Sequence, residues 1–117
     1  MLYFISFFLL SISLQQEPTV SIVDKVTFKE LISDGIPLVD VRRPGEFEAG
    51  HIKKAKNINF LADDFIKNIV ELDTTKPLLI YCRSGKRSGR ASRIMDSLGF
   101  KKIYDLKGGY LNWTTIE

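Results

Sequence analysis

The 117-residue sequence contains one cysteine, Cys82, and one histidine, His51. A single cysteine excludes an intramolecular disulfide and a cysteine-rich metal site. A zinc site would need carboxylates beside the one histidine, and no ligand spacing of that kind occurs in the sequence. We therefore expect neither a metal nor a cofactor.

The sequence also lacks a strong excess of charge of either sign. Its formal net charge is +3, with 44% hydrophobic and 26% charged residues, which is ordinary for one soluble globular domain. The positive charge is concentrated just after Cys82 and forms no stripe interleaved with aromatic residues. We therefore expect no nucleic-acid partner.

No apolar run reaches the roughly 20 residues that a membrane-spanning helix needs. Residues 1–14 are uncharged and mostly apolar, and the first charged side chain is Glu17. This length is typical of the apolar part of a signal peptide, although no Lys or Arg precedes it. We expect residues 1–16 to be a signal peptide and the mature protein to be exported, periplasmic or secreted. The alternatives are an uncleaved anchor, which alone would imply membrane contact, and a hydrophobic extension.

Residues 20–117 are predicted to form one α/β domain. Short apolar runs alternate with helical patterns, which favours a mainly parallel central sheet flanked by helices on both faces. The expected strands are residues 20–23, 37–41, 55–59, 77–81 and 102–106. The expected helices are residues 28–33, 62–72 and a helix that starts at residue 88, with a helical turn at 44–48.

Three local patterns support the predicted helices. Thr27 and Glu30 have the spacing of a capping box at the start of the first helix, and Gly35 would end it. The apolar side of the second helix would hold Phe65, Ile66, Ile69 and Val70. The apolar side of the third would hold Ile94, Met95 and Leu98.

Cys82 follows the predicted buried strand 77–81 and precedes a helix, so it lies at the carboxyl end of a strand. Ligands bind at that edge of open α/β sheets. Arg83, Lys86 and Arg87 follow closely, and no acidic residue occurs before Asp96. Helix N-termini and nearby cations favour the thiolate form of a cysteine, and a tight loop can turn its N–H groups towards an anion. The alternative is a small apolar core residue.

Asp40, Arg42, Glu46 and His51 form a second polar cluster after the predicted strand 37–41. The cluster contains both signs of charge, and buried charges need partners. We interpret it as a hydrogen-bonded scaffold that holds its loop beside the Cys82 loop. The alternative is a catalytic role, with His51 as a general base.

Three segments together resemble the signatures of rhodanese-type sulfurtransferases, in the order of that family. They are the loop 82–88 (CRSGKRS), the stretch 38–52 (LVDVRRPGEFEAGHI) and the closing segment 106–113 (LKGGYLNW). The resemblance spans about residues 20–113. It implies a rhodanese-like fold, in which Gly108 and Gly109 let the chain pass close to the site. One departure is Lys54, where the family usually has glycine.

The resemblance also implies a reaction. The Cys82 thiolate would attack the outer sulfur of an anionic donor such as thiosulfate, release sulfite and hold the sulfur as a persulfide. A thiol or cyanide acceptor would then remove that sulfur. Arg83, Lys86 and Arg87 would bind the donor through their positive charge, and the planar guanidinium groups of the two arginines suit sulfonate oxygens.

Two other functions remain open. A cysteine phosphatase or arsenate reductase on the same fold would also hold a thiolate in an anion cradle. Four residues separate Cys82 from Arg87, whereas in those relatives the corresponding loop is one residue longer. A non-catalytic binding module is the other alternative, and such modules commonly lack the cysteine.

Overall fold

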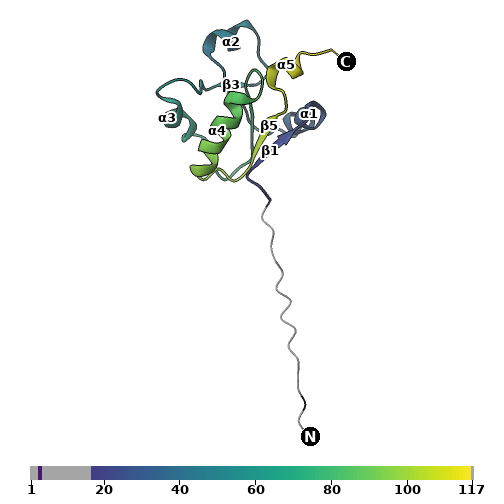
Figure 1. Ribbon diagram of the computed structural model, residues 1–117, viewed down its shortest axis with the longest axis vertical. Coiled ribbons are helices and arrows are strands. Elements are labelled where there is room, and N and C mark those ends of the chain that lie inside the picture. Colours follow the sequence, from purple (N-terminus) through teal and green to yellow (C-terminus); the bar gives the residue numbers. More distant parts are fainter. Residues whose placement is uncertain (1–2, 4–16, 117) are drawn as a thin grey trace.

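The computed structural model describes residue 3 and residues 17–116 of the chain. The strands are β1 (Val20–Val23), β2 (Leu38–Asp40), β3 (Lys56–Asn57), β4 (Leu78–Tyr81) and β5 (Ile103–Leu106). The helices are α1 (Lys25–Ser33), α2 (Pro44–Ala49), α3 (Phe65–Ile69), α4 (Lys86–Ser97) and α5 (Gly109–Trp113). The expected alternation of strands and helices is therefore present (Figure 1).

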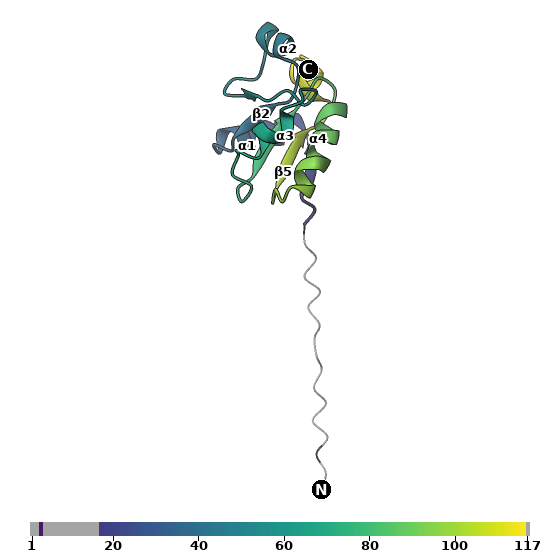
Figure 2. The ribbon, with the colours of Figure 1, turned by 90° about the vertical axis from the view of Figure 1, so that its left-hand side faces the viewer.

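The five strands form one parallel sheet in the order β1-β5-β4-β2-β3. Helices cover both of its faces, with α1 on one side and α4 on the other (Figure 2). Alternate residues of β4 enter different cores: Ile80 packs with Met95 of α4, and Leu79 packs with Phe28 of α1. Because β4 is covered on both sides, it needs an almost continuous apolar run. The predicted fold class is thus confirmed.

The first helix begins earlier than the sequence predicted. It starts at Lys25 because Asp24 is its N-cap, and the Asp24 carboxylate accepts a hydrogen bond from the Thr27 amide at 2.9 Å. The capping box of Thr27 and Glu30 was therefore wrong. Gly35 does follow the end of the helix, in a left-handed conformation with φ of 85°.

The other two predicted helices also differ in detail. Of the predicted helix 62–72, the structure forms only α3. Phe65 and Ile69 are buried, and Ile66 and Val70 are about half exposed. An apolar pattern alone overestimated the buried face, because α3 has only five residues, little more than one turn. Helix α4, which follows the Cys82 loop, starts at Lys86, two residues before its predicted start.

Parallel pairing places the carboxyl ends of β2 and β4 side by side. Asp40 of β2 is level with Tyr81 of β4, and β4 is the central strand. The segment after β2 forms α2, which lies above this edge of the sheet (Figure 1). Residues far apart in the sequence, the stretch after Asp40 and the loop after Tyr81, are therefore neighbours.

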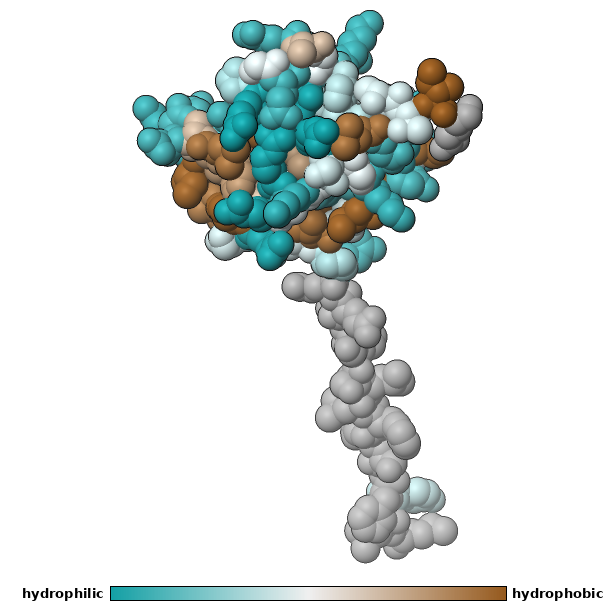
Figure 3. Space-filling model, turned by 45° about the horizontal axis from the view of Figure 1, so that its top comes forward, coloured by the Kyte–Doolittle hydropathy of each residue, from teal (hydrophilic) through white to brown (hydrophobic). Residues whose placement is uncertain are grey.

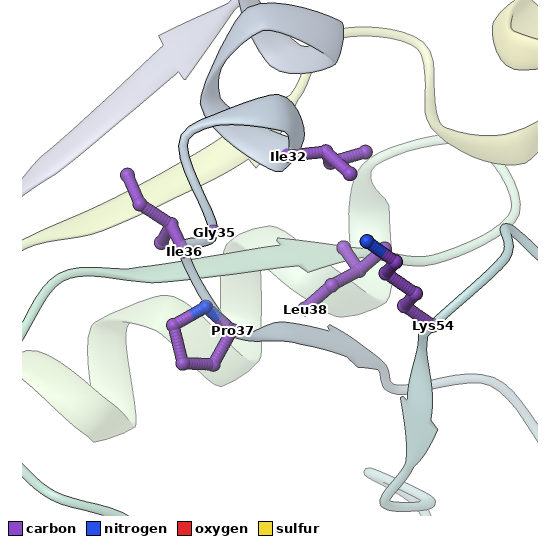
Figure 4. A pocket seen from close by; sticks show the side chains of 6 residues that line it. All are labelled: Ile32, Gly35, Ile36, Pro37, Leu38 and Lys54. Carbon is purple, nitrogen blue, oxygen red and sulfur yellow. The ribbon is translucent and has the colours of Figure 1, made fainter.

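Lys54 adopts a left-handed conformation with φ of 74°, the only non-glycine residue among those described to do so. The turn that usually contains glycine in the family thus forms here with a lysine. Lys54 also lines a pocket with Leu38 and Ile32 at the start of β2 (Figure 4). The pocket lies at the amino edge of the sheet, away from Cys82.

The expected signal peptide, residues 1–16, lies outside the described residues except for Tyr3, and export remains a prediction. Within the part of the chain that the structure describes, no helix is long and apolar enough to cross a membrane.

Candidate active site

Cys82 lies directly after β4 and is almost fully buried, with 1% of its surface exposed. The backbone N–H of Gly85 donates a hydrogen bond to its Sγ at 3.1 Å. Gly85 has φ of 105°, which favours glycine, and it precedes the first turn of α4. The first N–H groups of a helix have no partner within the helix. The loop therefore places a thiol in front of backbone donors that suit an anion.

A second chain segment closes against this loop. The N–H of Tyr110 donates to the carbonyl of Cys82 at 2.8 Å, and the N–H of Leu111 donates to that of Arg83 at 3.0 Å. A Cβ at Gly109 would lie 2.6 Å from these backbone atoms, and Gly109 has φ of 60°. Only glycine fits this approach. The sequence-based expectation that Gly109 allows close passage agrees with this geometry.

Arg83 and Lys86 are exposed beside the loop. Within the described residues, the two ion pairs involve other cations, Arg42 and Arg87. Arg83 also lines a mainly apolar pocket with Tyr110 and Leu111. Figure 3 views this side of the molecule obliquely, and hydrophilic residues cover much of the visible face. Arg83 and Lys86 are thus the cations of the loop that remain available to an anionic ligand.

Arg87 is held by Glu46 of α2. Its Nη1 and Nη2 donate to Glu46 Oε1 and Oε2 at 2.7 and 3.0 Å. The hydrogen bonds from Arg87 lower the pKa of Glu46 from 4.5 to about 2. The guanidinium fork of Arg87 is therefore committed to a carboxylate, and the pair ties α2 to α4.

Asp40 and Arg42 form a buried pair beneath α2. Arg42 Nη2 donates to Asp40 Oδ2 at 2.7 Å and to the carbonyl of Gly50 at 2.6 Å. The guanidinium carbon lies 4.2 Å from the ring centre of Tyr110 and 5.6 Å from that of Tyr81. This pair therefore connects the end of β2, the end of α2 and the closing segment.

His51 lies apart from these ion pairs. It is exposed, its ring stacks on Phe47 with centroids 3.7 Å apart, and its Nδ1 lies 2.9 Å from the carbonyl of Phe47. The predicted cluster of four residues is therefore divided: Asp40 pairs with Arg42, Glu46 pairs with Arg87 outside the cluster, and His51 lies apart. The short contact to Phe47 belongs to the end of α2.

One buried carboxyl of the structure, Asp105, was not among the residues predicted from the sequence. Asp105 of β5 is 3% exposed, and its Oδ1 has no hydrogen-bond partner among the described residues. Burial raises the pKa of Asp105 from 3.8 to about 6, and a hydrogen bond from Ser88 of α4 opposes this rise. An acidic residue within an otherwise apolar strand is the sequence signal that could have drawn attention to it.

The chemistry of the site centres on one thiol. Cys82 is the only cysteine of the chain, the Gly85 N–H faces its sulfur, and the exposed cations Arg83 and Lys86 stand beside the loop. Among the described residues no group of three or more His, Cys, Asp or Glu side chains could hold a metal ion. The arrangement suits nucleophilic attack by sulfur on an anionic substrate.

Residues 24–116 match the family described as Rhodanese-like domain. The uncharacterized protein YqhL of Bacillus subtilis is 46% identical over 76 residues, covering 65% of this chain and 59% of its own length. Thiosulfate sulfurtransferase GlpE of Pseudomonas syringae is 37% identical over 86 residues, covering 73% of this chain and 78% of its own.

A third relative is named for a different activity. The tRNA uridine(34) hydroxylase of Pelagibacter ubique is 38% identical over 95 residues, which cover 78% of this chain and 31% of the relative. The chain thus spans less than two thirds of two of these relatives. Among solved structures, human single-domain sulfurtransferase TSTD1 has a TM-score of 0.70 at 24% identity, covering 86% of this chain and 99% of its own.

Proposed function

The chain belongs to the rhodanese-like domain family, and on this premise we propose that it is a sulfurtransferase that carries sulfur as a persulfide on Cys82. The observation that carries the proposal is the Gly85 N–H directed at Sγ, 3.1 Å away, with Arg83 and Lys86 exposed beside it. Relatives named thiosulfate sulfurtransferase support the same reaction class.

The first half-reaction forms one sulfur–sulfur bond and breaks another. The Cys82 thiolate attacks the outer sulfur of thiosulfate, the bond between the two donor sulfurs breaks, and its electron pair leaves with sulfite. Cys82 then carries a persulfide anion. Sulfite needs no proton to leave, so this step requires no general acid and His51 has no part in it.

The second half-reaction restores the enzyme. A thiolate or cyanide attacks the outer sulfur of the persulfide, and the Cys82 thiolate leaves. The products are an acceptor persulfide or thiocyanate. Because the enzyme is covalently modified between the two substrates, ping-pong kinetics are expected.

Three cations have different proposed parts. Arg83 and Lys86 contact the sulfonate oxygens of the donor, because both are exposed and unpaired by the described carboxylates. Arg87 adds positive charge near Cys82. The hydrogen bonds to Glu46 raise the pKa of the Arg87 guanidinium. Its fork holds α2, so it supports donor binding without reaching the donor.

Mass spectrometry of the intact protein after incubation with thiosulfate tests the proposal. We expect a gain of one sulfur on Cys82, reversed by cyanide, and no gain in Cys82→Ser. Turnover of an aryl phosphate or of arsenate, without any sulfur gain, would instead assign the phosphatase or arsenate reductase alternative. An unmodified protein with no turnover would indicate a binding module.

A further inference from the structure

Two adjoining pockets lie beside α1, the helix that covers the face of the sheet opposite α4 (Figure 2). Their volumes are about 230 and 440 Å³, and Ile32 near the end of α1 lines both. We call the two together the α1 groove. Its apolar lining consists of Ile32, Ile36, Pro37, Leu38, Ile52 and Trp113. Taken together, the pockets have the size and the apolar character of a small-molecule site.

Lysines supply the fixed charge of the α1 groove. Lys29, Lys53 and Lys54 line it, and none of the other described residues in the lining carries a carboxylate. The two ion pairs in the described part of the chain involve other residues. The Lys29 ammonium instead lies 5.4 Å from the ring centre of Trp113. The groove therefore combines an apolar surface with positive charge that no described ion pair neutralises.

Lys54 is the charged residue of the groove that the family pattern does not predict. It stands where the family usually has glycine, and it adopts φ of 74°. A left-handed backbone is strained for lysine and unstrained for glycine. The side chain of Lys54 extends towards Ile32 and Leu38 with its nitrogen foremost (Figure 4). The strained residue thus places at the edge of an aliphatic pocket a charge that glycine would not supply.

We propose that the α1 groove binds a small amphiphilic carboxylate, a molecule with an aliphatic chain and one carboxylate end. The chain lies along Ile32, Ile36 and Leu38, and the carboxylate meets the ammonium groups of Lys53 and Lys54. Lysine suits this end group because it is a compact charge on a flexible stem. The site includes neither Cys82 nor the cations of its loop, so it does not depend on the proposed sulfur transfer.

Octanoate is the probe, and octan-1-ol is its uncharged match. Trp113 is the one tryptophan of the chain and lines the groove, so its fluorescence reports binding to the full chain. We expect saturable binding of octanoate below about 1 mM and binding of octan-1-ol about tenfold weaker. Each methylene group removed from the acid should weaken binding by about two- to fourfold. Amide NMR shifts should gather at residues 52–54 and 113.

Substitutions separate the charge from the apolar lining. Lys54→Gln should weaken octanoate binding by about three- to fivefold and leave octan-1-ol binding unchanged. Ile36→Asn should weaken the binding of both ligands, because it makes the aliphatic lining polar. Lys67→Gln, at an exposed position of α3, is the matched control and should change neither. If Lys54→Gln loses stability, Lys54→Gly gives the same comparison, because glycine suits the left-handed backbone.

Three outcomes would overturn the inference. The first is the absence of saturable octanoate binding below about 1 mM, or equal affinity for the acid and the alcohol. The second is unchanged octanoate binding in both Lys54 variants. The third is a set of NMR shifts confined to the Cys82 loop, which would place the anion at Arg83 and Lys86. A failure of sulfur transfer alters none of these measurements and would refute only the proposed function.

Discussion

The ion pair between Glu46 and Arg87 should contribute measurably to stability and hold α2 over the Cys82 loop. We consider Glu46→Gln, Arg87→Gln and the double variant, which together form a double-mutant cycle. Each single substitution removes one side of the two hydrogen bonds at 2.7 and 3.0 Å. The cycle isolates the energy of the pair from other effects of each substitution.

The expected coupling energy follows from the pKa of Glu46. Its fall from 4.5 to about 2 is a difference of about 2.5, which corresponds to an upper limit of about 3 kcal/mol at 1.36 kcal/mol per unit. Both side chains keep solvent contact, with 28% and 19% of their surface exposed. Exposed pairs contribute about 0.2–1 kcal/mol, so we expect a coupling of about 1–2 kcal/mol for this half-buried, bidentate pair.

The pH dependence gives a second check. Because the folded pKa of Glu46 is depressed, its contribution is complete above the unfolded pKa of 4.5 and is lost as the pH falls towards about 2. Urea denaturation should therefore show the full stability difference between wild type and Glu46→Gln at pH 7 and a smaller difference at pH 3. Arg93→Gln, on the exposed side of α4, is the control and should change stability little.

Kinetics separate a scaffold from a donor ligand. If Arg87 acts through Glu46, both single variants should slow persulfide formation by similar factors, and the double variant should be no slower than either. A coupling energy near zero at pH 7 would refute the structural role. A loss of kcat/KM for thiosulfate in Arg87→Gln far beyond that in Glu46→Gln would show that Arg87 contacts the donor directly.

Four further predictions concern single residues. Cys82→Ser should keep the fold and lose sulfur transfer, so residual turnover within about tenfold of wild type would exclude Cys82 as the carrier. Gly109→Ala should abolish activity and lower the free energy of unfolding by about 3 kcal/mol, while the open helical site Gly89→Ala should stabilise by up to about 1 kcal/mol. Lys54→Gly should stabilise the protein by about 0.5–1 kcal/mol in thermal unfolding, because glycine adopts this left-handed conformation without the steric strain that lysine has there. Because the folded pKa of Asp105 exceeds the unfolded value, its penalty grows between pH 3.8 and about 6, so Asp105→Asn should stabilise by about 1–2 kcal/mol at pH 8 and little at pH 4.

Local patterns in the sequence were sufficient for the fold class and for the position of Cys82. A continuous apolar run before a cysteine, a glycine and a basic stretch has few structural solutions, and a covered central strand followed by a helix is one of them. The close passage of the chain at Gly109 could also be predicted, since consecutive glycines indicate a turn or a close approach. These features depend on neighbours in the sequence, and sequence patterns report such neighbours directly.

Partners were decided by the tertiary structure alone. Arg87 was interpreted as a donor ligand because its charge follows Cys82, yet its guanidinium binds Glu46, 41 positions away. The burial of Asp105 could not be predicted because it depends on α4 lying across β5. His51 was assigned to a polar cluster from the sequence, and the structure divides that cluster. A charge, a hydroxyl or a ring takes its role from the atoms around it. Those atoms come from strands and helices whose order in the sheet is fixed only when the whole core is packed.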